Sequence, residues 1–371
     1  MPRINRDRLT AFLMLTPSII LLAIFVYGFI GSTVYTSLTD SNQIQQYSRL
    51  PTNYVGLKNY TDLFAGMLNN RFRIDMVNTV FFTILFIIAC LGLGLGLAML
   101  LDQKIKGENL FRTIFLFPMA ISFVVTGVVW KWLFNPDNGI NLLPTFIGLP
   151  KGEFRWFISR DRWLTFNWQD VPLIMTYIIL TIVIVVALWY WSRRRSMVAA
   201  LFTAAALLVL AYISFGDPRS LNGLARVEQH GFNVALLALV VAAAWQMSGY
   251  TMAMYLAGLR GIPDELREAA RVDGANELAV YRRIVLPLLA PITLSAMIIL
   301  GHISLKIFDL VYALGGGDNL YIDMPGLNMF FLTFRGGDLA KGAAVATIML
   351  ILVAVVIVPY LVANLRGEKS L

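Results

Sequence analysis

Long apolar segments constrain the fold of this chain more than any other feature of its sequence. The hydrocarbon core of a bilayer is about 30 Å thick, so a crossing helix needs roughly 20 apolar residues. The segments lack the alternation of polar and apolar residues that membrane β-barrel strands require. The sequence therefore predicts an all-α membrane protein, a polytopic bundle of about eight transmembrane helices. The expected spans are 11–38, 77–101, 110–134, 171–191, 197–215, 232–259, 290–314 and 342–365.

Composition agrees with a membrane-embedded chain. Of the 371 residues, 58% are hydrophobic and 14% are charged, whereas about one quarter of a soluble domain is charged. The net charge of +8 comes from basic residues in short loops beside apolar segments, which indicates membrane topology rather than a groove for nucleic acid. The single cysteine, Cys90, lies inside an apolar run and cannot form an internal disulfide.

Lysine and arginine placement predicts the orientation of the bundle. If the amino terminus is cytoplasmic, the inner segments hold 16 Lys or Arg in 63 residues and the outer segments hold 12 in 116. The strongest local signal is the run Arg193, Arg194 and Arg195, in a turn of about five residues. Because cytoplasmic loops are enriched in basic residues, both termini are expected inside a bacterial or archaeal cell membrane. Residues 11–30 indicate a span rather than a cleaved signal peptide.

The charged segment 260–287 predicts two short helices joined by a turn. Pro263 suits a first helical turn, where its missing N–H is not needed. Gly274 stands where a helix ends with positive φ, Asn276 can cap the next helix, and Pro287 leads into the following span. The spacing alone leaves two interpretations open: a compact surface for docking a partner, or a solvated loop between spans.

Several chemistries lack their motifs in this sequence. No glycine-rich loop ends in Gly-Lys-Ser/Thr, so no ATP site of that kind is expected in the chain. No Cys/His cluster has metal-ligand spacing, and only two histidines, His230 and His302, are present. We therefore expect a transport subunit that is not an enzyme and binds no cofactor or metal.

A motif in the charged segment resembles the signature of permease subunits in binding-protein-dependent ABC importers. The pattern is Glu-Ala-Ala, three residues, Gly, nine residues, Ile-x-Leu-Pro. Nearby groups such as Trp245 and the segment 257–259 resemble the carbohydrate-uptake branch, in particular its larger, maltose-type first permease. The resemblance covers most of residues 10–166 and 232–365. The residues expected to couple to the ATPase are those of the motif and the acidic neighbour Asp273. They are Glu268, Ala269, Ala270, Asp273, Gly274, Ile284, Leu286 and Pro287.

This resemblance implies a core of the type I ABC importer permease and a role for the 260–289 loop. The loop would form a coupling helix that docks in a cleft of a cytoplasmic ATPase, with Glu268 as its charged contact, the two alanines as its close-packing face and Gly274 as its turn. The implied partners are a second permease, an ATP-binding subunit dimer and an extracytoplasmic solute-binding protein. ATP and Mg would be held by the ATPase.

The resemblance also divides the chain. The expected parts are 1–38 with the first span, 39–166 with spans two and three, an inserted hairpin at 167–231, and 232–365 with the last three spans. Residues 167–231 have no counterpart in the usual permease pattern. They are expected to face lipid outside the transport core or to contact a partner subunit. Residues 150–170, rich in Trp, Phe and Arg, suggest an interfacial helix or a plain surface loop.

Polar groups in the seventh span allow three interpretations: a translocation path, a structural pair, or groups near the outer end of the span that bulk water solvates. Ser295, His302, Lys306 and Asp309 are spaced to share one helical stripe. An unpaired charge at mid-membrane costs about 2.5–3.5 kcal/mol on insertion scales, so an inward face and pairing are expected. The stripe could bind substrate hydroxyls, or Lys306 and Asp309 could fix a helix interface. The candidate path residues are His302, Lys306, Asp309, Tyr312, Gln246 and Tyr250.

Three glycines of the second span, Gly92, Gly94 and Gly96, predict close helix packing. Gly92 and Gly96 are four residues apart, the spacing at which small residues let two membrane helices approach.

Together these features favour an ATP-driven importer of an oligosaccharide, a disaccharide or a related solute. A third class, a membrane scaffold or sensor, would need no lined path. The main alternative is a secondary transporter driven by an ion gradient. Such a protein would show inverted repeats, broken helices and ionisable residues in several spans, and its large cytoplasmic loop would have no evident purpose.

Overall fold

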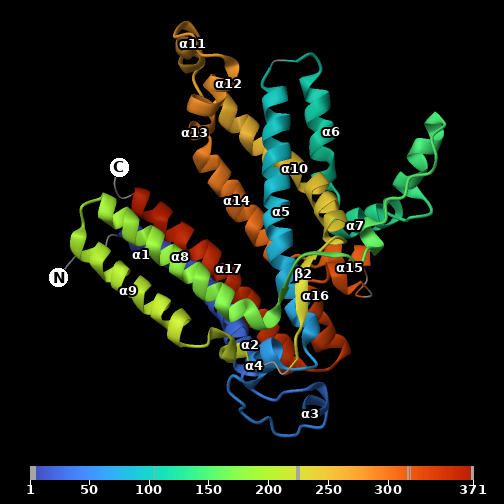
Figure 1. The fold of residues 1–371 in the computed structure, drawn as a ribbon, viewed down its shortest axis with the longest axis vertical. Helices are drawn as coiled ribbons and strands as arrows, with labels where there is room; N and C mark the ends of the chain where they lie inside the picture. The colour runs from blue at the N-terminus through green and yellow to red at the C-terminus, as the bar shows by residue number, and fades with distance from the viewer. Residues whose placement is uncertain (1–5, 104, 223–225, 316, 318, 369–371) are drawn as a thin grey trace.

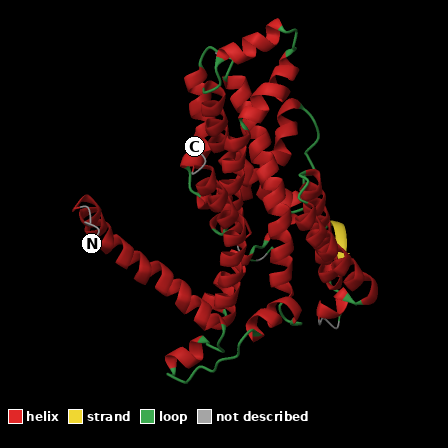
Figure 2. Ribbon diagram, turned by 90° about the vertical axis from the view of Figure 1, so that its left-hand side faces the viewer, coloured by secondary structure: helices red, strands yellow, loops and turns green. Residues whose placement is uncertain are grey.

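The computed structural model describes residues 6–103, 105–222, 226–315, 317 and 319–368, and these form a helical protein with one small sheet (Figures 1 and 2). Short 3-10 and π-helical segments join several of the helices. The α-helices are α1 Arg6–Leu22, α2 Phe29–Ser37, α3 Gln43–Tyr47, α4 Lys58–Ala65, α5 Asn70–Leu101, α6 Glu108–Ala120, α7 Phe123–Leu133, α8 Val171–Ser192, α9 Ser196–Phe215, α10 Leu236–Arg260, α11 Asp264–Val272, α12 Glu277–Val280, α13 Leu286–Leu288, α14 Ala290–Leu305, α15 Asp309–Gly315, α16 Pro325–Phe330 and α17 Leu339–Glu368.

The helices match a multi-pass membrane protein. Within the described residues, six helices are long and apolar enough to cross a membrane, and two bent pairs bring the number to as many as eight. The first span joins α1 and α2 through a π-helical turn, and its apolar window has no buried residue. Figure 2 shows this helix running away from the rest of the molecule. The predicted fold class is confirmed.

The core lies where α5 packs along α10. Phe82, Phe86 and Leu239 are fully buried here. The two helices approach closely at Gly94, because a Cβ on this glycine would lie 2.1 Å from the Thr251 hydroxyl oxygen. A Cβ on Gly92 or on Gly96 would meet no atom within 4 Å. The prediction of close packing therefore holds for the middle glycine and is wrong for the outer two.

Two predicted spans are broken. α6 and α7 meet at 100°, so the straight span expected at 110–134 is wrong. Pro118 lies in the last turn of α6 and cannot donate a backbone hydrogen bond, and Ser122 caps the start of α7. After the bend, α7 packs on α15 through Gly127, whose Cβ position lies 2.6 Å from that of Ala313.

The second break separates the helix Glu277–Leu288 from α14 by 63°. The predicted span 290–314 also ends early, because α14 stops at Leu305 and a separate helix, α15, begins at Asp309. Two short helices that follow the ends of longer ones, α7 and α15, pack against each other.

The segment between the two strands contains the expected hairpin. α8 and α9 pack on each other, and their buried residues are few: Ala187 in α8, and Ala199 and Ala206 in α9. Strand β1 (Arg162–Asn167) precedes the hairpin and pairs antiparallel with β2 (Gln229–Asn233), which follows it. The interfacial helix predicted for residues 150–170 is therefore wrong, because β1 lies in this segment. Pairing with β2, rather than local periodicity, determines this structure.

Different elements form the two ends of the molecule. The α11–α12 region and the α5–α6 turn lie together at the top of Figure 1, and α3 and α4 lie at the opposite end. The α8–α9 turn lies at the left of the same view, apart from α11.

Candidate functional site

The 260–289 loop folds as its sequence predicts. α11 ends in a Schellman motif, in which Ala275 N–H donates to the Ala270 carbonyl at 2.9 Å and Gly274 N–H to the Arg271 carbonyl at 3.0 Å. Gly274 has φ +83°, the left-handed conformation that glycine adopts without steric cost. The Asn276 side chain then accepts from Ala279 N–H at 2.8 Å and caps α12.

An ion pair joins α11 to the end of α5. Arg267 Nη1 donates to Asp102 Oδ2 at 2.7 Å, and its Nη2 donates to the Leu259 carbonyl at 2.9 Å. The two side chains are 12% and 10% exposed, so water screens this pair only weakly. A second pair, between Arg260 and Glu108, links α10 to the start of α6. The loop is thereby fixed to three helices.

The outer surface of the loop is exposed. Glu268 and Ala269 are exposed, and the nearby Val272 and Leu278 are 87% and 76% exposed. No ion pair to Glu268 is present in the part of the chain that the structure describes. Ala270 differs from the expectation for the two alanines, because it is half-buried against the chain's own core.

The rest of the motif leads from the loop into the membrane. Ile284 lies in the π-helical segment Tyr281–Val285, and Leu286 and Pro287 begin α13. Val285 is fully buried, whereas Leu286 is 41% exposed. Asp273 is exposed at the C-cap of α11. The structure thus places the marked residues on one continuous segment beside the ends of α5 and α10.

The predicted polar stripe of the seventh span is not continuous. Lys306 is the C-cap that follows α14 and Asp309 begins α15, so the helical register that would align them is interrupted. Both side chains are exposed, and within the described residues no ion pair joins them. Tyr312 is 37% exposed, and its hydroxyl accepts a 3.2 Å hydrogen bond from Arg335.

The other candidate path residues are mostly covered. Gln246 is 3% exposed, and its Nε2 donates to the Ile121 carbonyl at 2.7 Å, directly at the α6–α7 break. This contact gives a hydrogen-bond donor to the Ile121 carbonyl, which the break leaves without a partner in the helix. Tyr250 is half-buried against the core, and His302 is half-buried with its Nδ1 buried and unpaired among the described residues.

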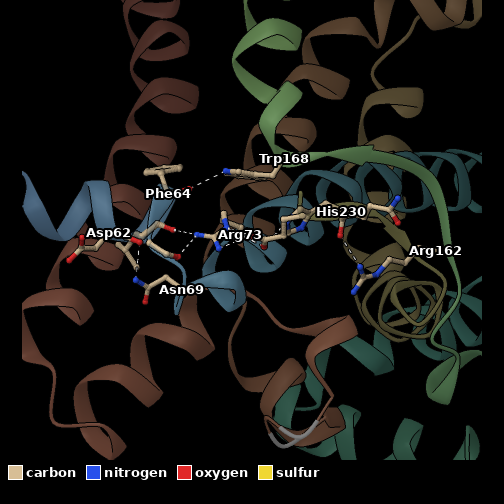
Figure 3. Close-up of polar contacts among 11 residues, drawn as sticks. Asp62, Phe64, Asn69, Arg73, Arg162, Trp168 and His230 are labelled. Atoms are coloured by element: carbon tan, nitrogen blue, oxygen red, sulfur yellow. Dashed lines mark hydrogen bonds and ion pairs between the residues drawn. The ribbon is translucent and has the colours of Figure 1, made fainter. Parts of the chain in front are cut away.

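Sequence reasoning missed a buried ionic cluster at the other end of α5 (Figure 3). Arg73 is fully buried and donates to Glu228 through Nε and Nη2, at 3.0 and 2.7 Å to Oε2. His230 Nε2 lies 2.9 Å from Glu228 Oε1, and burial lowers the pKa of this histidine. Trp168 Nε1 donates to the Phe64 carbonyl at 3.1 Å. The cluster holds the base of the hairpin against α4 and α5.

The cluster continues toward α16. Asn328 donates to the buried Asp75 at 2.8 Å, Asn233 donates to Asn78 at 2.7 Å, and Arg71 pairs with Asp323 at 2.5 Å. The sequence signal was the group of charges directly before the apolar run of the second span. The expected second span begins at residue 77 and leaves these charges outside it, but α5 begins at Asn70 and takes them into the folded interior.

Comparisons with known proteins point to one family. Residues 190–367 match the family described as the binding-protein-dependent transport system inner membrane component. A probable ABC transporter permease of Pyrococcus horikoshii is 32% identical over 96% of each chain. The xylose/arabinose import permease protein XacH of Haloferax volcanii is 32% identical over 92% of this chain and 84% of its own.

A solved structure has the same fold. One chain of a bacterial alginate ABC transporter, crystallised with an alginate pentasaccharide-bound periplasmic protein, superposes with a TM-score of 0.61. The match covers 95% of this chain and 93% of that chain at 17% sequence identity. The family match, the 32% identity over nearly the whole chain and the shared fold agree. This chain therefore belongs to the binding-protein-dependent transport system inner membrane components, the permease subunits of ABC transporters.

Proposed function

We propose that this chain is one of two permeases in an ATP-driven importer of a carbohydrate: an oligosaccharide, a disaccharide or a related solute. The sugar-transport names of relatives such as the xylose/arabinose permease support the substrate class. The motif at 268–287 supports the maltose-type first permease as the closest functional type. The chain has the broken helices expected of a secondary transporter. Its membership of the ABC permease family nevertheless argues against that alternative function.

The single observation that carries this proposal is the exposed but anchored 260–289 loop. Its helix α11 presents Glu268 and Val272 to the outside while Arg267 fixes it to Asp102. A helix that is exposed on one side and tied to α5 on the other can transmit a push from a bound ATPase to the membrane helices. ATP-driven closure of the ATPase dimer would then swing the spans as rigid bodies.

The second permease would cover the exposed face formed by α7 and α15. Val128, Trp132 and Tyr312 are 58%, 62% and 37% exposed on these packed helices. Lys306 and Asp309 are exposed beside them. In this proposal the two permeases enclose a path here, and these polar groups line it. The first span, whose apolar window holds no buried residue, gives a further surface for the second permease or for lipid.

The proposed orientation places the 260–289 loop and both termini in the cytoplasm. ATP and Mg would be held by the ATPase subunits, and this chain would bind no cofactor itself. An extracytoplasmic solute-binding protein would deliver the substrate at the opposite side. The solved alginate transporter, which was crystallised with such a protein, supports this arrangement.

The test is ATP-dependent uptake of a panel of labelled sugars by the full complex in proteoliposomes. Glu268→Ala is compared with Glu265→Ala, since both glutamates are exposed on α11 and only Glu268 belongs to the motif. We expect Glu268→Ala to lose uptake and to weaken ATPase assembly, and Glu265→Ala to keep both. Equal behaviour of the two variants would refute the coupling role, and uptake that does not depend on ATP would refute the importer.

A further inference from the structure

The turn between α8 and α9 carries an uncompensated positive charge. Arg193, Arg194 and Arg195 are all exposed, and no acidic side chain pairs with them within the described residues. Some arginines near the proposed cytoplasmic side are paired, as in the contacts of Arg267 with Asp102 and of Arg271 with Glu277, whereas Arg282 and Arg283 are exposed and have no ion pair within the described residues. The charge of the turn is therefore left for a partner outside this chain.

The acidic residues of the hairpin lie at its far end. Asp170 precedes α8 and Asp217 follows α9, and Asp170 pairs with Arg219 at 2.7 Å. Each helix has about twenty residues between these acids and the arginine turn. The hairpin is thus a pair of apolar helices with a cationic end and a separate, locally neutralised end.

The surroundings of the turn are those of a membrane interface. Trp189 and Trp191 are 49% and 69% exposed in the last turn of α8, and the Arg193 guanidinium lies 4.6 Å from the centre of the Trp189 ring. Tryptophan is enriched at the level of the lipid headgroups. The helices that lead to the turn expose apolar side chains such as Ile182 and Leu201. The three arginines therefore sit where headgroups lie.

We propose that the α8–α9 turn is a binding site for the headgroups of anionic phospholipids in the cytoplasmic leaflet. The guanidinium groups would donate paired hydrogen bonds to lipid phosphates, a geometry that arginine favours. α9 begins at Ser196, so the positive end of its dipole adds to the same field. The site would anchor a hairpin that is otherwise buried only at a few alanines.

Lipid fits this surface better than a protein partner. The arginines stand at the ends of helices whose sides are exposed and apolar, and a soluble acidic protein would leave those sides uncovered. The turn also lies apart from α11 in Figure 1, so a subunit that docks on α11 is not directed toward it. This inference rests on the proposed orientation and is independent of the proposed substrate.

The test uses the full complex in nanodiscs that contain photoactivatable phosphatidylglycerol or photoactivatable phosphatidylcholine. Mass spectrometry then locates the lipid adducts along the chain. We expect more phosphatidylglycerol adducts than phosphatidylcholine adducts at residues 189–197. Removal of one arginine should lower the ratio of the two adducts about fivefold. Excess inorganic phosphate should leave the adducts in place, because a free anion lacks the acyl chains.

Two sets of variants control the measurement. The first set consists of the single variants Arg193→Gln, Arg194→Gln and Arg195→Gln. Each keeps two arginines and should therefore keep the topology of the hairpin. Labelling of Ser192→Cys with a membrane-impermeant reagent verifies that topology. The double variant Arg155→Gln/Arg160→Gln removes exposed arginines elsewhere and should leave the adducts unchanged. Equal adducts of the two lipids would overturn the proposal and leave the arginines a topological role only. Adducts that are absent from the full complex and appear only after the ATPase is stripped from it would overturn the proposal in favour of a protein partner.

Discussion

Arg267 on α11 and Asp102 at the end of α5 form a 2.7 Å hydrogen-bonded ion pair that joins the exposed loop to the longest membrane helix. The pair is largely covered, and Arg267 also donates to the Leu259 carbonyl at the end of α10. A force applied to α11 therefore reaches α5 and α10 through one side chain. In an ABC permease, this contact is well placed to connect the ATPase with the transport path.

Loss of this pair should uncouple transport. In Arg267→Gln or Asp102→Asn, a hydrogen bond between charged groups worth about 1.5–3 kcal/mol is lost. We expect sugar uptake to fall about tenfold or more while the ATPase subunits still hydrolyse ATP. The uncoupling can be checked by measuring sugar uptake and ATP hydrolysis in the same proteoliposomes.

The matched control is Arg271→Gln, which breaks the exposed pair with Glu277 and should change uptake little. The charge-swapped double variant Arg267→Asp/Asp102→Arg should recover part of the uptake if the contact itself matters. Wild-type uptake in Arg267→Gln would show that the loop transmits force by another route.

Much of the 260–289 loop was predictable because its signals are local. The positive φ of Gly274 and the cap at Asn276 depend on neighbours a few residues away. The contact between Arg267 and Asp102 was not predictable in the same way, since the two residues are 165 positions apart. The half-buried position of Ala270 likewise depends on α5 and α10, which no local pattern reports.

Gly274→Ala should weaken the loop through backbone strain alone. Its φ of +83° costs an L-residue about 1–2 kcal/mol, and a Cβ there would meet no atom within 4 Å. We expect ATPase assembly to weaken by roughly five- to thirtyfold. Gly261→Ala is the control, because Gly261 lies near the same loop at φ −83°. Pull-down of the ATPase against concentration gives both affinities, and equal losses would contradict the strain argument.

The buried cluster at the Asn70 end of α5 should be a principal source of stability. Arg73→Met leaves Glu228 without its strongest partner, and breaking a buried pair from one side costs about 3–5 kcal/mol. We expect a clear drop in the thermal unfolding temperature in detergent. Arg219→Gln breaks a pair that is 59% exposed on the arginine side and should change the unfolding temperature little. A small effect of Arg73→Met would mean that water replaces the lost contacts.

The same cluster predicts a pH dependence of stability. Burial lowers the pKa of His230 below its usual 6.5, so the folded chain binds this proton less readily than the unfolded chain. Its contribution to stability is complete above pH 6.5 and is lost as the pH falls below that value. Thermal unfolding of the wild type should therefore weaken from pH 7.5 to 5.5, and His230→Gln should flatten this part of the curve. An unchanged slope in the variant would assign the dependence to another group.

Neither this cluster nor the helix breaks can be located from hydropathy alone. Arg71, Arg73 and Asp75 carry the composition of an outer loop, and only their partners on distant elements make their burial possible. The break at Ile121 has two local signals, Pro118 and Ser122, but hydropathy registers neither one because apolar residues continue on both sides. Hydropathy thus locates membrane segments well but does not show where a helix bends.

The contact of Gln246 with the Ile121 carbonyl should stabilise the α6–α7 bend. Gln246→Leu keeps the size and removes the donor, which leaves a carbonyl unsatisfied inside the bundle at a cost of about 1–3 kcal/mol. We expect a lower unfolding temperature and reduced uptake, because α7 carries the exposed face proposed to line the path. Ser248→Ala, in the same helix, removes only a long 3.4 Å contact and should leave both unchanged. If Gln246→Leu unfolds at the wild-type temperature but loses uptake of one sugar selectively, Gln246 contacts substrate and the bend is held by packing instead.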